Sequence, residues 1–247
     1  MVVPVYEEDG RLPPGFRPWV MWGLVAANVL VFIFLAINPA MVVVVLAYHF
    51  GTVPAFLTGA TSSEEFNLLV PSWVTLATYT FVHPAWFHLA ANMIFLWVFG
   101  DNVEAATGHL RFLALYVMSG VAGGLAHVVS DTHSEIPLIG ASGAVAGIVG
   151  AYLLIRPCAA VTVLLLGVIT VKLRAYWMLG IWIAWQIIHV TLLRSGDEIA
   201  YWSHLGGFVA GLLLMPALRR RGVKLLPGLR CPMALRRTIA HVRRRLG

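Results

Sequence analysis

Six long apolar runs constrain the fold of this chain more than any other feature of its sequence. A helix that crosses a bilayer needs about 20 predominantly apolar residues. The runs that reach or approach this length are 18–37, 85–105, 110–129, 142–155, 175–193 and 203–218. Only 11% of the residues are charged, whereas a soluble domain usually has about 25%. The sequence therefore predicts an all-α, polytopic membrane protein with six transmembrane helices.

The distribution of Lys and Arg predicts the orientation of the chain. Segments that face the cytoplasm are enriched in these residues. If the N-terminus is cytoplasmic, the inner segments contain all 17 Lys and Arg residues except Arg194. We therefore expect a multi-pass protein of the cell (inner) membrane with both termini cytoplasmic and the loop containing Glu64 and Glu65 outside. The net charge of +6 is then a topology signal and does not indicate nucleic-acid binding.

The chain divides into three parts and shows no internal repeat. The parts are a cytoplasmic N-terminal segment (1–17), a six-span membrane domain (18–218) and a basic cytoplasmic tail (219–247). Within the tail, four apolar residues share a helical face opposite the arginines: Leu235, Ile239, Val242 and Leu246. This pattern favours an amphipathic helix on an anionic leaflet, and a solvated disordered tail is the alternative. The β-branched run 161–171 is too short to span and predicts an interfacial segment on the inner side.

Polar residues interrupt three of the runs near their outer ends. They are His88 and Asn92 in the second run, Ser142 in the fourth and His204 in the sixth. His88, Ser142 and His204 lie 13 to 15 residues before the charged residue at the inner end of the run. This spacing puts each of them about 20–22 Å from the inner edge of the membrane, and thus about 8–10 Å below the outer face. Because polar groups at such depth are costly, a common plane indicates a functional site.

Glycines next to these polar groups predict how the helices pack. Gly143 and Gly147 form a G-x-x-x-G pattern in the fourth run, and Gly207 and Gly211 form another in the sixth. Gly140 lies just ahead of the serine. Small residues at this spacing let membrane helices approach closely. We therefore expect the fourth and sixth helices to pack backbone to backbone, which brings the serine within reach of the histidine.

These residue types suit nucleophilic catalysis. A serine hydroxyl is a poor nucleophile until a base takes its proton, and neutral imidazole can do so near neutral pH. His88, Asn92 and the backbone N–H of Ser142 could donate hydrogen bonds to a developing oxyanion. No carboxylate lies at this depth. The sequence therefore predicts a catalytic dyad of Ser142 and His204 without an orienting acid.

Three motifs follow one another on the second, fourth and sixth runs: His88-x-x-x-Asn92, Gly140-Ala141-Ser142-Gly143 and Ser203-His204-x-x-Gly207. With these motifs the region from about residue 74 to 218 resembles the rhomboid family of intramembrane serine proteases. His83 also fits the family's pattern in this region. The resemblance implies a six-helix rhomboid-like bundle with a water-filled cavity that opens to the outer side.

The resemblance also implies an activity: hydrolysis of peptide bonds in or near transmembrane segments of membrane-protein substrates. It makes Ser142 the nucleophile and His204 the general base and acid. His88 and Asn92 become the donors to the oxyanion.

Two positions depart from the family's pattern. Many members carry an aromatic residue four positions after the serine, where it stacks on the base, and here that position is Ala146. We therefore expect either that another ring, such as Trp202 or a ring of the second run, positions His204, or that the base is held less firmly. The family's Trp-Arg pair in the first loop has no match around residues 73–75, so the anchoring of that loop must differ.

Other functions remain as alternatives. A rhomboid-like pseudoenzyme binds or escorts membrane clients without cleaving them, but such proteins typically lack the serine or the histidine. A small transporter calls for charges or broken helices at mid-membrane, and no run has a charge in its core. For His88 and Asn92 alone, a hydrogen bond between helices is the structural alternative.

The expected partners are the lipid bilayer and membrane-protein substrates with a transmembrane helix. The nine histidines show no ligand spacing and no His-Glu-x-x-His motif, so we expect no metal. We also expect no other cofactor and no nucleic acid.

Overall fold

The computed structural model describes residues 2–7, 12–63, 66–165, 169–193 and 200–227. Each predicted run forms a helix: α1 (Trp19–Ala36), α5 (Trp86–Thr107), α6 (His109–Ser130), α7 (Ser142–Ile155), α8 (Ala175–Ile188) and α9 (Tyr201–Leu218). A π-helical turn, η2 (His189–Leu193), continues α8. The expected all-α, polytopic fold is confirmed. The predicted amphipathic helix at 235–246 and the acidic pair at 64–65 lie outside the described residues.

The long helices differ in whether each is long enough by itself to cross a membrane. By length and composition α1, α6, α9 and α8 with the start of η2 are each long enough. The helix α5 passes the same test together with the short segment Thr75–Phe81 before it, from which it is bent by 101°. That segment consists of α4 (Thr75–Thr78) and the 3-10 turn η1 (Tyr79–Phe81). The helix α7 has only 14 residues, fewer than the roughly 20 that a spanning helix needs.

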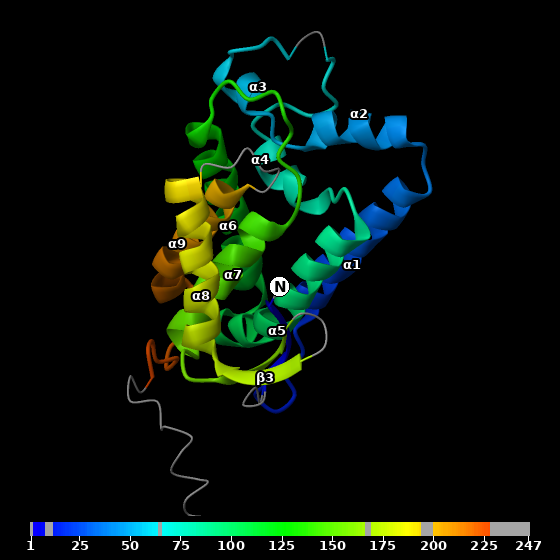
Figure 1. Cartoon of the computed structure of the whole chain (residues 1–247). Coiled ribbons are helices and arrows are strands. Elements are labelled where there is room, and N and C mark those ends of the chain that lie inside the picture. The colour runs from blue at the N-terminus through cyan, green and yellow to red at the C-terminus, as the bar shows by residue number, and fades with distance from the viewer. Residues whose placement is uncertain (1, 8–11, 64–65, 166–168, 194–199, 228–247) are drawn as a thin grey trace, which may run out of the picture.

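The short helix α7 is the centre of the bundle (Figure 1). It packs against α5, α6 and α9, and most of its side chains are buried. A Cβ atom on Gly207 would overlap the carbonyl oxygen of Gly143, and a Cβ on Gly211 would overlap that of Gly147. The backbones of α7 and α9 are therefore in direct contact, at a separation that only glycine permits.

A small antiparallel sheet closes the end of the bundle opposite α2 (Ala40–Phe50) and α3 (Pro54–Thr58) (Figure 1). Its order is β1 (Val2–Glu7), β2 (Ala160–Leu165) and β3 (Ile169–Arg174). The described parts of the β-branched run 161–171 thus belong to two paired strands, and Val163 pairs with Pro4 on one side and Val171 on the other. Val161 and Val163 are buried against the hydrophobic core of the helices. The sheet therefore packs on the end of the helical bundle.

Buried polar contacts fix the N-terminal strand to the helix ends. Arg156, which follows α7, has its Nε 2.8 Å from Glu7 Oε1. Asn102 of α5 donates from Nδ2 to Glu7 Oε2 (2.7 Å) and accepts from Arg156 at Oδ1 (3.1 Å). Glu7 is only 6% exposed. A buried carboxylate needs such partners, because an unpaired one would be strongly destabilising.

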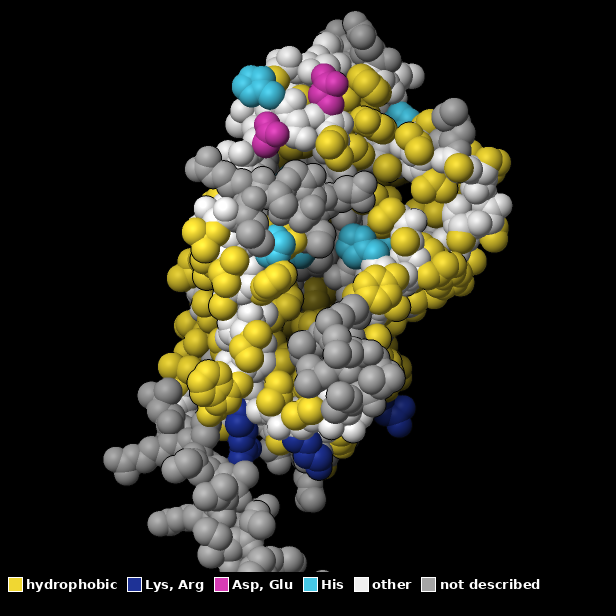
Figure 2. All heavy atoms as spheres, in the orientation of Figure 1, with side chains coloured by type: hydrophobic (Ala, Val, Ile, Leu, Met, Phe, Trp, Pro, Cys, Tyr) yellow, Lys and Arg dark blue, Asp and Glu magenta, His cyan; other side chains and the backbone are white. Residues whose placement is uncertain are grey.

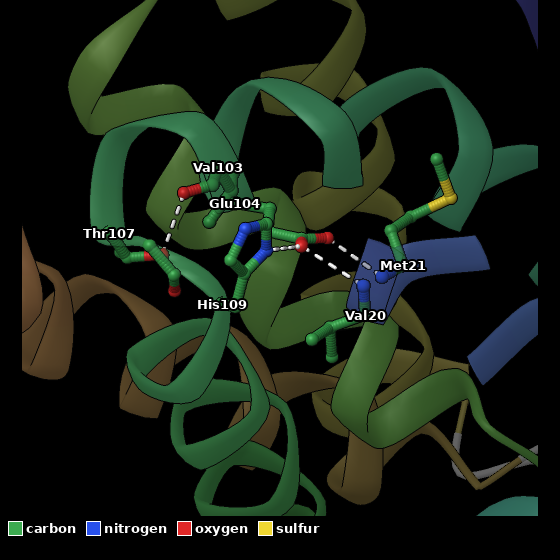
Figure 3. A network of polar contacts seen from close by, with 7 residues as sticks. Val20, Met21, Val103, Glu104, Thr107 and His109 are labelled. Carbon is green, nitrogen blue, oxygen red and sulfur yellow. Dashed lines mark hydrogen bonds and ion pairs between the residues drawn. The ribbon is translucent and has the colours of Figure 1, made fainter. Parts of the chain in front are cut away.

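Glu104 joins the start of α1 to the end of α5 (Figure 3). Its carboxylate accepts the backbone N–H groups of Val20 (3.0 Å) and Met21 (2.7 Å), and it lies 2.5 Å from His109 Nδ1. The side chain is fully buried. The first N–H groups of a helix lack partners within the helix, and a negative charge there is favourable. The second predicted run, 85–105, thus forms a helix that continues two residues further, to Thr107.

Replacing Glu104 by alanine should destabilise the protein without changing the surroundings of Ser142 or His204. Loss of hydrogen bonds to a buried charge costs about 1.5–3 kcal/mol, which corresponds to a fall in Tm of about 3–12 °C for a chain of this size. Thermal unfolding in detergent measures the change. Glu135→Ala is the matched control, because Glu135 is exposed and the hydrogen bond that it accepts from the Thr61 hydroxyl (2.8 Å) lies at the surface. Equal melting temperatures for the two variants would contradict the anchoring role.

Candidate active site

Ser142 is the first residue of α7, and the chain reaches it through a glycine with positive φ. Gly140 has φ +115, a conformation that L side chains rarely adopt. A Cβ at this position would also lie 2.6 Å from Cε1 and 2.7 Å from Nε2 of His88. The ring of His88, in the first turn of α5, therefore packs directly on the backbone two residues before Ser142.

His83 connects the His88-x-x-x-Asn92 motif to the residue before Ser142. Its Nε2 lies 3.2 Å from the backbone nitrogen of Ala141 and 3.1 Å from Nδ2 of Asn92. A backbone N–H can only donate, so Nε2 must be the acceptor and the ring proton must sit on Nδ1. The amide of Asn92 is then also a donor to His83, and its second N–H is left for another acceptor.

His83 is 1% exposed, and its ring lies 5.3 Å from that of His88 in an edge-to-face arrangement. The sequence analysis gave His83 no role. It lies in the turn between η1 and α5, where helical periodicity carries no signal. Only its place in the family's pattern singled it out.

His204 lies in the first turn of α9 and is held from α8. Its Nδ1 is 2.9 Å from Oε1 of Gln186, a residue that is only 4% exposed. The ring of Trp182 lies 6.0 Å from the His204 ring at 34°, and that of Tyr201 lies 6.4 Å away at 83°. The prediction that Trp202 or a ring of the second run contacts His204 is wrong. Trp202 is 46% exposed, and within the described chain the ring contacts of His204 come from α8 and α9.

The two helices that carry Ser142 and His204 touch at the neighbouring residues. A Cβ on Gly143 would lie 2.6 Å from Oγ of Ser203. No hydrogen bond joins Ser142 to His204 among the residues that the structure describes. Hydrogen bonds of this kind are often long in free enzymes and tighten when substrate binds. The structure therefore brings the serine and histidine segments together without closing the bond between them.

A buried polar cluster lies beside the two segments. The hydroxyl of Tyr79 donates to the carbonyl oxygen of Gly120 (2.9 Å) and lies 3.4 Å from Oγ of Ser203. Tyr79 belongs to η1, Gly120 to α6 and Ser203 to α9. This cluster could not be predicted from the sequence, because its members are distant in the chain and Ser203 alone among them belongs to a motif. It links three helical segments around the start of α7.

The histidines border a hollow in one face of the molecule (Figure 2). In the same view hydrophobic side chains cover the surface below the hollow, Lys and Arg gather at the lower end, and Asp and Glu appear only at the upper end. The site therefore lies between an apolar belt and the acidic end of the described molecule.

Comparison with known proteins identifies the family. A family model, the Rhomboid domain, matches residues 70–221. RHOMBOID-like protein 5 of Arabidopsis thaliana is 35% identical over 142 residues, which are 54% of this chain and 40% of that protein. Rhomboid protein 1, mitochondrial, of Saccharomyces cerevisiae is 32% identical over 148 residues (58% and 41%). Rhomboid protease GluP of Bacillus subtilis is 33% identical over 138 residues (56% and 24%).

The matched region thus covers less than half of the length of each of these relatives. The region that the family model matches nevertheless contains α5 to α9 and every residue of the three motifs. Because the family model spans more than half of the sequence, this chain belongs to the rhomboid family.

Proposed function

We propose that this chain is an intramembrane serine endopeptidase that cleaves peptide bonds in or near transmembrane segments of membrane-protein substrates. One observation carries the proposal: α7 and α9 meet at Gly143 and Ser203, the residues next to Ser142 and His204. The name of one relative, Rhomboid protease GluP, supports the same activity.

In the proposed reaction Ser142 Oγ attacks the carbonyl carbon of the scissile bond, and His204 takes the hydroxyl proton. The tetrahedral intermediate collapses when His204 returns the proton to the leaving amine. Water then attacks the acyl-enzyme, again with His204 as base, and releases the second product. The two attack steps, by the serine hydroxyl and by water, each require a neutral imidazole with a lone pair toward the reacting O–H, whereas collapse of the intermediate uses the protonated ring as acid.

The oxyanion would form near the start of α7. The N–H of Ser142 lies at a helix start, where backbone donors have no partner within the helix. Asn92 has one amide N–H beyond the contact with His83, and His88 lies against Gly140. Because His83 holds both Ala141 and Asn92, a single buried ring would set the spacing of these donors. Preorganised donors of this kind stabilise the transition state.

We also propose an orientation, with both termini cytoplasmic and the site open to the outer side of the cell (inner) membrane. Gathering of the described Lys and Arg side chains at the sheet end of the molecule supports it (Figure 2), since such residues favour the cytoplasmic side. The proposed division is an N-terminal segment (1–17), a membrane domain (18–218) and a basic tail (219–247).

Ser142→Ala and His204→Ala should each abolish cleavage. A generic single-span substrate incubated with the protein in detergent measures the activity. Loss of either member should lower kcat by at least about 10³-fold, and the double variant should be no worse than either, because the residues act as a unit. Activity near wild type in either single variant would refute the dyad. Wild-type protein that binds the substrate but neither cleaves it nor reacts with a fluorophosphonate would favour a client-binding pseudoenzyme.

Asn92→Ala should slow turnover while leaving substrate affinity unchanged. Loss of one oxyanion donor typically lowers kcat by about 10²–10³-fold. Reaction of Ser142 with a fluorophosphonate should continue more slowly, since the dyad remains. If Asn92 serves only to hold His83, the melting temperature should instead fall while turnover per folded molecule stays intact. That result would assign Asn92 to packing.

The orientation predicts which residues a membrane-impermeant thiol reagent can reach. Cysteines introduced at Ser63, in the outer loop, and at Val223, beyond α9, lie at opposite ends of the proposed topology. In a background without the native cysteines, intact cells should label the first position and only permeabilised cells the second. Labelling of residue 223 in intact cells would reverse the orientation.

A further inference from the structure

Two residues of α8, one helical turn apart, contact the ring of His204. Gln186 presents its carbonyl oxygen to Nδ1 at 2.9 Å, and Trp182 places its ring 6.0 Å from the imidazole ring. Residues at i and i+4 lie on the same helix face, so one face of α8 makes both contacts. Gln186 is 4% exposed and is the only glutamine in the chain. A buried amide on an otherwise apolar helix calls for an explanation, because burying it unbonded costs free energy.

The hydrogen bond determines which nitrogen of His204 carries the proton. A carbonyl oxygen can only accept, so the proton must lie on Nδ1. In a neutral imidazole the other nitrogen, Nε2, then holds the lone pair. The proposed mechanism needs that lone pair to receive the proton of Ser142. In serine hydrolases a third group bonded to Nδ1 commonly fixes this tautomer and the orientation of the ring.

Resting on the proposed protease function, we propose that Gln186 is the positioning residue of the Ser142–His204 dyad, a neutral counterpart of the acid in a catalytic triad. Trp182 supplies the ring contact that an aromatic residue at position 146 would otherwise make, and here that residue is Ala146. The base is thus held from α8 by an amide and an indole. An amide fixes the tautomer but carries no charge, so it stabilises the imidazolium less than a carboxylate would.

A purely structural role makes a different prediction. The same hydrogen bond could serve only to tie α8 to α9, as polar bonds between membrane helices do. Its removal would then lower stability and leave turnover per folded molecule unchanged. A positioning role changes kcat, leaves KM unchanged, and alters the pH dependence of the reaction.

The titratable groups around His204 come from several helices. They are His88 of α5, His127 of α6, Tyr201 of α9 and His189 of η2, which stacks on Tyr201. Within the described chain no carboxylate is bonded to His204. Introducing one at position 186 therefore tests the direction of the hydrogen bond. A glutamate can accept from Nδ1 but cannot donate in its ionised form.

The experiment compares four full-length proteins in detergent: wild type, Gln186→Met, Gln186→Glu and the control Ile187→Met. Ile187 is 47% exposed and lies about 100° round α8 from Gln186, so its replacement leaves the His204 contact intact. For each protein we would measure kcat and KM on a single-span substrate, the rate of Ser142 labelling by a fluorophosphonate as a function of pH, and Tm. Gln186→Leu replaces the Met variant if the latter does not fold.

Gln186→Met should lower kcat and the labelling rate by about 10–100-fold, the usual effect of losing a group that orients a functional histidine, with KM within about twofold. Gln186→Glu should keep activity within about tenfold of wild type, because it still accepts from Nδ1. Its acidic limb should move to higher pH, since a nearby carboxylate favours the imidazolium. Ile187→Met should match wild type.

Three results would overturn the inference. Wild-type kinetics in Gln186→Met would show that the dyad needs no support from α8. A lower Tm with turnover per folded molecule intact would make the bond a helix tie. A Glu variant as slow as the Met variant would show that the amide does not act as an acceptor. In each case wild type still reacts at Ser142, whereas failure of wild type to label or cleave would remove the proposed function itself.

Discussion

The direct contact between the backbones of α7 and α9 is the constraint on which the rest of this structure depends. Gly207 lies against the Gly143 carbonyl and Gly211 against that of Gly147, so neither glycine can carry a side chain. Lipid tails are as apolar as leucine, so helices in a membrane associate through close packing and polar bonds more than through the hydrophobic effect. The short α7 can lie at the centre of the bundle only because its neighbours approach this closely. The start of α7 is then enclosed by α5, α6 and α9, which places Ser142 among three histidine-bearing segments.

Buried polar groups around this centre are organised by side chains that accept backbone N–H bonds. His83 accepts from Ala141, and Glu104 accepts from Val20 and Met21. Each thereby satisfies donors at a helix start that would otherwise be unpaired. The two acceptors lie at opposite ends of α5, one before its first residue and one in its last turn. The two ends of α5 thus hold the segment before Ser142 and the start of α1.

The sequence predicted the six helices well, because hydropathy over about 20 residues reports directly on the cost of burying backbone and charges in lipid. It also placed His88, Ser142 and His204 in the first turns of their helices, since each count began from a charged residue at the inner end. It could not predict Gln186 or Trp182 as partners of His204. Their contact depends on how α8 is rotated about its axis, and α8 is apolar on all sides, so its periodicity gives no orientation. The pairing of β1 with β2 was also out of reach, because more than 150 residues separate the two strands.

That separation has a consequence for the order in which the chain assembles. The strand β1 can pair with β2, the one strand described beside it, only after the first four long helices have been synthesised. The carboxylate of Glu7 likewise meets Arg156 only when α7 is complete. Until then the first residues of the protein have neither a strand nor a cation to bind. Contacts between such distant segments form late, because closing the intervening loop costs entropy before any bond is gained. The sheet can therefore close only after α7 has been made, although β1 precedes α1 in the chain.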